Sequence, residues 1–221
     1  MNRTTAFSLA VLGLAAGAYP RAASAADEET QVWLTGTMIT TVAKEVTGTF
    51  ELSRRFREGD DQILLRGNAD YRLSRMASVG GGAAYVNSID GVFETGEDKE
   101  FRLHQQLTLS FAMFALRTRV EQRFFQNADR MSVRVRQRIQ ATAPVTKDTH
   151  AAFSGELFYI VRSEDVGGDE GIAQWRLNAT LVHRPSRTLE VTVGYLLMHT
   201  PRSGVPDKIA HVPQLTLAYR R

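Results

Sequence analysis

Arginine recurs at every second position over two neighbouring stretches in the middle of the chain. With one Arg before them and one after, the positions are Arg102, Arg117, Arg119, Arg123, Arg134, Arg136, Arg138 and Arg176. Guanidinium groups that leave water need carboxylates or bound anions as partners. The acidic residues that share their phase are Glu51, Asp70, Glu121, Glu156 and Glu190. The spacing therefore predicts a network of arginines and carboxylates along one face of several strands.

Two interpretations of this network differ in what fills the space around it. Paired arginines and carboxylates could fill a narrow barrel and hold it shut, which is a structural role. Surplus arginines could instead line a narrow pore that lets small anions pass. A barrel of about ten strands has little room once long side chains occupy it, so we favour the filled interior.

Catalytic chemistry has weaker support in the residues. The histidines are His104, His150, His183, His199 and His211. There is no GxSxG motif. Ser110 and His104 share one strand face but stand six residues apart, or roughly 20 Å, so they cannot touch. We predict no enzyme, no catalytic residue and no cofactor, and rank a lipid-hydrolysing membrane enzyme last.

An acidic stretch, Ser163 to Glu170, holds four carboxylates around Gly167 and Gly168. Such a loop could bind a hard cation such as Ca²⁺ or bridge cations of lipopolysaccharide. A solvated loop is the better interpretation, because surface loops are commonly polar. Cys is absent and no strand carries paired His at ligand spacing, so no metal site is predicted.

The elements that carry these residues alternate with period two. Over 101–113, for example, Phe101, Leu103 and Leu107 oppose Arg102, His104 and Gln106. That alternation is typical of strands that separate an apolar from a polar environment. The segments predicted as strands are 31–41, 46–55, 62–73, 77–86, 101–113, 116–124, 133–139, 151–161, 171–183, 188–198 and 214–220.

Short and long connections alternate between these segments, as in an up-and-down barrel. The short ones are Leu73–Ala77, Met113–Ala115 and Arg184–Thr188, and the long ones are Asn87–Glu100, Arg162–Gly171 and Thr200–Lys208. Thr142–Thr149 falls among the short ones yet is longer. The run Gly80 to Gly82 suggests a bend or bulge. Bacterial barrels of this class use even strand numbers, so eleven segments leave one missed, split or not spanning, and we expect about 10–12 strands.

Aromatic residues fall near the ends of several segments and suggest interfacial girdles, although ordinary strand aromatics would look alike. They are Trp33, Tyr71, Tyr85, Tyr159, Trp175, Tyr195 and Tyr219.

Residues 1–25 read as a cleaved signal peptide. Arg3 provides the positive region, Phe7 to Ala16 the short apolar region, and Ala23-Ser24-Ala25 the cleavage site. Removing Arg3 and Arg21 leaves 25 basic against 24 acidic residues, so the balance gives no reason to expect nucleic acid. After residue 25 no apolar run approaches a spanning helix. We therefore predict an all-β, antiparallel transmembrane barrel over residues 26–221, in the outer membrane of a Gram-negative cell.

Several short motifs fit one family. They are QVW ending at Trp33, LRTRVEQRF from Leu116, RVRQRI, GIAQWRLN, EVTVGYLL and the closing IAHVPQLTLAYR. Together they resemble the domain-of-unknown-function family 2490, proteobacterial proteins with signal peptides that are predicted to form outer-membrane barrels. The resemblance covers essentially the whole chain after the signal and implies an envelope location, but no activity.

The partners expected for such a barrel are outer-membrane lipid, lipopolysaccharide and the barrel-assembly machinery. That machinery commonly reads a final aromatic residue, whereas Arg221 stands here after Tyr219 and Arg220. The alternative is a soluble periplasmic barrel that binds a ligand inside. Register separates the two, because a soluble barrel would turn its charged face outward and its Leu, Val and Phe inward.

Overall fold

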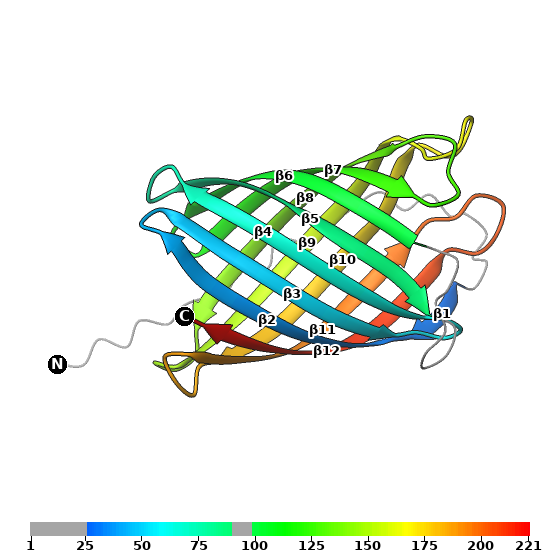
Figure 1. The fold of residues 1–221 in the computed structure, drawn as a ribbon. Helices are drawn as coiled ribbons and strands as arrows, with labels where there is room; N and C mark the ends of the chain where they lie inside the picture. Colours follow the sequence, from blue (N-terminus) through cyan, green and yellow to red (C-terminus); the bar gives the residue numbers. More distant parts are fainter. Residues whose placement is uncertain (1–25, 90–98) are drawn as a thin grey trace.

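Strands account for nearly all of the computed structural model, which describes residues 26–89 and 99–221 (Figure 1). The predicted signal peptide and the centre of the connection after Asn87 lie outside these residues. The strands are β1 (Asp27–Thr30), β2 (Val32–Ala43), β3 (Val46–Phe56), β4 (Asp61–Arg72), β5 (Ala77–Ile89), β6 (Lys99–Phe111), β7 (Phe114–Phe125), β8 (Ser132–Pro144), β9 (Thr149–Arg162), β10 (Gly171–His183), β11 (Leu189–Thr200) and β12 (Lys208–Arg220).

The sheet closes on itself between its first and last long strands. From β2 to β12 each strand pairs antiparallel with its chain neighbour, while β12 pairs with β2 in parallel, from Gln214↔Trp33 to Arg220↔Ile39. The short β1 extends this parallel seam at one end of β12. The eleven long strands form a closed barrel. This number lies within the expected 10–12 strands. It is odd rather than even, because a parallel seam lets an odd number of alternating strands close.

The two ends of the barrel differ in their connections. One end, the turn end, carries the links 44–45, 73–76, 112–113, 145–148 and 184–188. The other, the loop end, carries links 57–60, 126–131, 163–170 and 201–207 together with β1. The segment Thr142–Thr149 is no exception, because β8 continues to Pro144 and leaves a link of ordinary length. At the loop end, Gly59 lies in the left-handed region (φ 92°) that the β3–β4 turn requires.

Alternation separates an outer apolar face from an inner polar one. On β6, Phe101, Leu103 and Leu107 face outward with exposed fractions of about 40%. His104 on the same strand and Glu121 on β7 are each 2% exposed inside the barrel. The charged face therefore lies inside, opposite to the register of a soluble barrel. Among the described residues no helix is long and apolar enough to cross a membrane.

The glycine run on β5 keeps a continuous register with β4 and β6, so the predicted bulge is wrong. The glycines are needed because atoms of β4 come too close to leave room for side chains at these positions. A Cβ on Gly82 would lie 2.1 Å from the carbonyl oxygen of Gly67, and one on Gly80 would lie 2.1 Å from Oδ1 of Asp70. Without side chains at these positions, residues of β4 and β6 can meet across the inner surface of β5.

Aromatic residues split between the two faces. Tyr71 and Tyr219 are about half exposed on the outside. Trp33 instead faces inward with 9% exposure, so its expected place in an interfacial girdle is wrong. It packs with Leu196, Met198 and other residues of β11 and β12.

Candidate functional site

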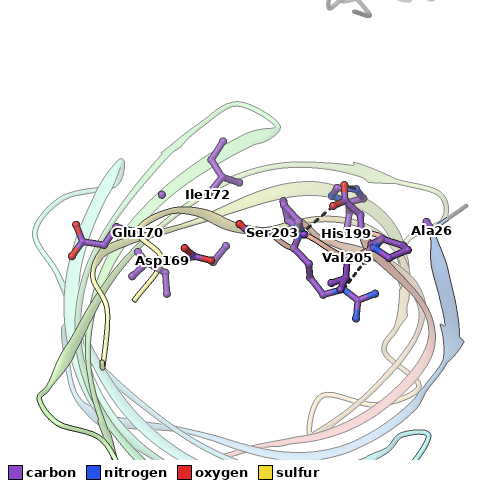
Figure 2. A pocket seen from close by; sticks show the side chains of 15 residues that line it. Ala26, Asp169, Glu170, Ile172, His199, Ser203 and Val205 are labelled. Atoms are coloured by element: carbon purple, nitrogen blue, oxygen red, sulfur yellow. Dashed lines mark hydrogen bonds and ion pairs between the residues drawn. The ribbon is translucent and has the colours of Figure 1, made fainter. Parts of the chain in front are cut away.

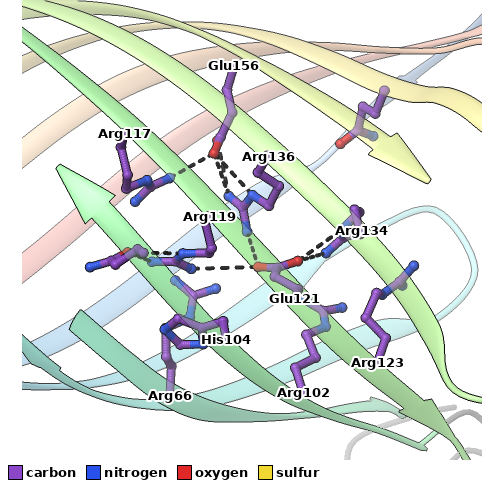
Figure 3. Close-up of polar contacts among 12 residues, drawn as sticks. Arg66, Arg102, His104, Arg117, Arg119, Glu121, Arg123, Arg134, Arg136 and Glu156 are labelled. Carbon is purple, nitrogen blue, oxygen red and sulfur yellow. Dashed lines mark hydrogen bonds and ion pairs between the residues drawn. The ribbon is translucent and has the colours of Figure 1, made fainter. Parts of the chain in front are cut away.

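A carboxylate on β7 is the centre of the inner network. Glu121 accepts hydrogen bonds from Arg134 at 2.5 and 2.9 Å and from Arg136 at 2.8 Å, and Arg119 lies 3.7 Å away (Figure 3). Arg134 and Arg136 come from β8, where Arg134 stands directly across from Glu121, and Arg119 comes from β7 itself. One buried negative charge thus balances several guanidinium groups that would otherwise repel one another.

The network continues to β9 through Arg136. Its Nε and Nη2 donate to Glu156 at 3.1 Å each, and Arg117 donates to the same carboxylate at 2.7 Å. Arg136 therefore bridges Glu121 and Glu156. Arg138 stands between Arg117 and Glu156 in the strand register, yet among the described residues it forms no ion pair.

A third carboxylate was missed by the sequence reasoning. Glu100 accepts from Arg102 at 2.7 and 2.5 Å and from Arg123 at 2.5 and 3.2 Å. It had been assigned to a long connection, whereas β6 already begins at Lys99. Its phase, two residues before Arg102, was the signal that could have found it. Without Glu100, Arg102 and Arg123 would face each other directly across the strands.

The inner surface over β5 joins the network to β4. The Nε2 of Gln106 donates to Asp70 at 2.6 Å, while Arg119 donates to the Oε1 of Gln106 at 2.7 and 3.1 Å. In parallel, His104 hydrogen-bonds to Asn68 at 2.7 Å. Both links pass over the glycines of β5, which lie between these pairs in the register.

An ion pair between neighbouring strands ends the network on this side. Arg66 of β4 donates to Glu51 of β3 at 3.2 Å. All twelve network residues predicted from the sequence therefore lie on the inner face. Eleven of them form ion pairs or hydrogen bonds, and of these Arg176 bonds only to a glutamine within the described part of the chain. The twelfth, Arg138, lies beside the network. Arg66 also belongs to the network, although it is not among the network residues predicted from the sequence.

Two aromatic rings hold arginines near the middle of the barrel. Phe158, 2% exposed, lies under the guanidinium groups of Arg134, Arg136 and Arg176 at 5.2, 4.4 and 4.4 Å. Arg176 also lies 5.5 Å from the ring of Trp33. Because Phe158 belongs to β9 and Trp33 to β2, Arg176 reaches from one side of the interior towards the other.

We call the inner face of β3 to β10 the arginine wall. Its arginines are Arg55, Arg66, Arg102, Arg117, Arg119, Arg123, Arg134, Arg136, Arg138 and Arg176, and its carboxylates are Glu51, Asp70, Glu100, Glu121 and Glu156. Arginines outnumber carboxylates two to one. We call the cluster on β2, β11 and β12 the apolar wall, which consists of Trp33, Leu196, Met198, Ala210 and Val212.

A cavity of about 1070 Å³ opens at the loop end, between the β9–β10 and β11–β12 connections (Figure 2). His199 lies 3.1 Å from Asp207 there, and Arg202 forms an ion pair of 2.5 Å with Asp27. The first contact holds the β11–β12 connection to β11, and the second ties it to β1.

The acidic loop beside this cavity is held by an arginine. Arg130 donates to the backbone oxygens of Ser163 and Asp165 at 2.9 and 3.2 Å and lies 3.9 Å from Glu170. Within residues 26–89 and 99–221 no three His, Cys, Asp or Glu side chains gather as a metal site. The histidines bond elsewhere: His104 to Asn68, His183 to Thr149 and His211 to Tyr195.

Comparison with known proteins gives one family. The family described as "Protein of unknown function (DUF2490)" matches residues 30–208. A search of curated proteins finds no match. One solved structure, from work described as "Unveiling the Mechanism Behind the in-meso Crystallization of Membrane Proteins", is 10% identical with a TM-score of 0.43, over 81% of this chain and 78% of that chain. Likeness at this level carries no argument about function.

Proposed function

Because the chain belongs to the DUF2490 family of proteins of unknown function, we propose a role from its own geometry: a structural β-barrel of the outer membrane with a closed, charged interior. The observation that carries the proposal is the inverted distribution of side chains. Large apolar residues cover the outside, while Glu121, Arg119 and Arg136 are less than a tenth exposed inside. Such a surface suits lipid, and in water it would be a large exposed apolar patch.

The strand lengths support the same role. The long strands have 11 to 14 residues, enough for tilted strands to cross a bilayer core. A closed sheet also leaves no unpaired edge in lipid, where an unsatisfied backbone group costs several kcal/mol. The expected partners remain outer-membrane lipid, lipopolysaccharide and the assembly machinery.

Fractionation of cells that express the full chain tests the location. We expect the protein in the detergent-extracted outer-membrane fraction, with a mobility on a denaturing gel that changes on heating, because closed barrels resist detergent until heated. Recovery in the salt-soluble periplasmic fraction would overturn the proposal and favour the ligand-binding soluble barrel.

A closed interior is favoured over an anion-conducting one by the contacts around Phe158. Arg136 is bound to two carboxylates and packed on this ring, so it is not free to accompany a passing ion. We expect planar bilayers containing the protein to be silent. Replacing Phe158 and Arg136 by Ala should produce discrete conductance, whereas Arg54→Ala, on the outward phase of β3, should not. Steady conductance of the unchanged protein would establish the pore instead.

A further inference from the structure

The arginine wall ends on both sides at the apolar wall, and its two outermost arginines have no carboxylate partner. Arg55 on β3 adjoins β2, and Arg176 on β10 adjoins β11. Among the described residues neither forms an ion pair. Three strands lie between them and present Trp33, Leu196 and Val212. Two acids on that side are bound elsewhere, because Glu190 of β11 holds Arg184 and Arg220, and Glu29 of β1 holds Lys208.

Both arginines gather on one indole ring. The guanidinium carbon of Arg55 lies 4.0 Å from the centre of the Trp33 ring, and that of Arg176 lies 5.5 Å from it. Cation–π contact stabilises each of them but supplies no acceptor for their N–H groups. The two like charges also repel each other.

Few of their donors are used. Arg55 donates to Gln62 at 3.0 Å, and its Nε is shielded from solvent without a hydrogen-bond partner. Arg176 donates through Nε to Gln174 at 2.5 Å, and within the described residues its two Nη groups donate to nothing. The neighbouring carboxylate, Glu156, is already held by Arg117 and Arg136. Two guanidinium groups with free donors thus share one small region of the interior.

We propose that Arg55 and Arg176 bind a small oxyanion, of the phosphate or sulfate type, beside Trp33. An oxyanion with several oxygens can accept from both guanidinium groups at once, in the forked geometry that arginine favours. It would supply the negative charge that Arg55 and Arg176 lack, since among the described residues neither forms an ion pair. Arg55 is the last residue but one of β3, so the proposed site lies towards the loop end of the barrel.

The inference rests on the closed interior of the proposed function but not on the outer-membrane location. Its test therefore uses the refolded full chain in detergent micelles, so that the result does not depend on where the protein lies in the cell. Trp175→Phe leaves Trp33 as the single tryptophan and reporter. Inorganic phosphate is titrated against sodium chloride at equal ionic strength, and a further arm adds phosphatidylglycerol to the micelles without phosphate.

We expect Trp33 emission to change saturably with phosphate, and much less with chloride or with the lipid. Arg55→Gln and Arg176→Gln should each raise the phosphate concentration at the midpoint of the titration about tenfold, as expected for loss of hydrogen bonds to a charged group. The matched control is Arg54→Gln with Arg138→Gln, which removes two charges elsewhere. Arg55→Lys and Arg176→Lys keep the charge and lose the fork, so they should bind with intermediate midpoints.

A response that does not saturate, or that survives in the Arg55→Gln, Arg176→Gln double variant, would overturn the proposal. A saturable response to the lipid alone would assign the site to a phosphate headgroup and overturn the free anion. If the double variant does not refold, the two single Lys variants test the proposal instead. An unchanged phosphate midpoint in both would contradict binding through the paired N–H groups of a guanidinium.

Discussion

The arginine wall and the apolar wall enclose one interior but are held together by different physics. In the arginine wall Glu100, Glu121 and Glu156 each hold two or more guanidinium groups, so removing one of these acids leaves several charges without a partner. In the apolar wall Leu196, Met198 and Val212 interact only by packing. A substitution in the arginine wall should therefore change the stability of the whole network, whereas a substitution in the apolar wall should affect only its immediate neighbours.

The largest effect should come from Glu121→Gln. This change keeps the shape of the side chain but leaves Arg119, Arg134 and Arg136 with an uncharged partner. We expect a loss of about 3–5 kcal/mol in the free energy of unfolding, the range for removing one member of a buried ion pair. Urea titration in detergent micelles, followed by tryptophan fluorescence, measures it.

The exposed Glu170→Gln serves as the control and should cost little. Adding Arg136→Gln to Glu121→Gln should cost less than the sum of the two single changes, since both act on one network. Strict additivity would mean that the arginine wall is not coupled, and the contrast with the apolar wall would be lost.

A change in the apolar wall should cost slightly less and remain local. Leu196→Ala removes a side chain that is 4% exposed, and a loss of about 2–4 kcal/mol is expected from the cavity it leaves. Combined with Glu121→Gln the effects should add, in the same urea titration. Val166→Ala in the β9–β10 loop, where the side chain is largely exposed, should be neutral. Strong non-additivity of the first pair would show that the walls act as one unit.

The smallest effect concerns the glycines that let the arginine wall extend over β5. Gly82→Ala would bring a methyl group against the backbone of Gly67 and the side chain of Asn68. We expect about 1–3 kcal/mol of destabilisation from overpacking. Gly36→Ala, whose Cβ meets nothing within 4 Å, is the matched control. Equal stability of the two variants would show that close approach over β5 is unimportant.

The sequence predicts those features that depend on the residues of a single strand. Alternation placed the strands and the inward phase of Arg117, Arg119 and Arg136, because charge and apolarity repeat with the pleat. It failed where a boundary was needed, since Glu100 was assigned to a connection and β8 was ended before Pro144. The Trp33 segment offered no regular alternation from which its inward direction could be read.

Contacts between strands that are not adjacent could not be predicted. The links from His104 to Asn68 and from Gln106 to Asp70 cross β5, and only the register of three strands brings them together. Among the described residues Arg55 and Arg176 have no carboxylate partner, and this depends on barrel closure, because closure alone decides which strands stand between them. The alternation of residues along each strand gives no information about how β12 pairs with β2.

The parallel seam has a consequence for rearranging the chain. Asp27 begins β1 at the loop end, whereas Arg220 ends β12 at the turn end (Figure 1). A linker from Arg220 back to Asp27 would have to run the length of a strand, on the order of 40 Å for twelve residues. Circular permutation, which in an even barrel needs only one more hairpin turn, would here require a linker long enough to act as a twelfth strand.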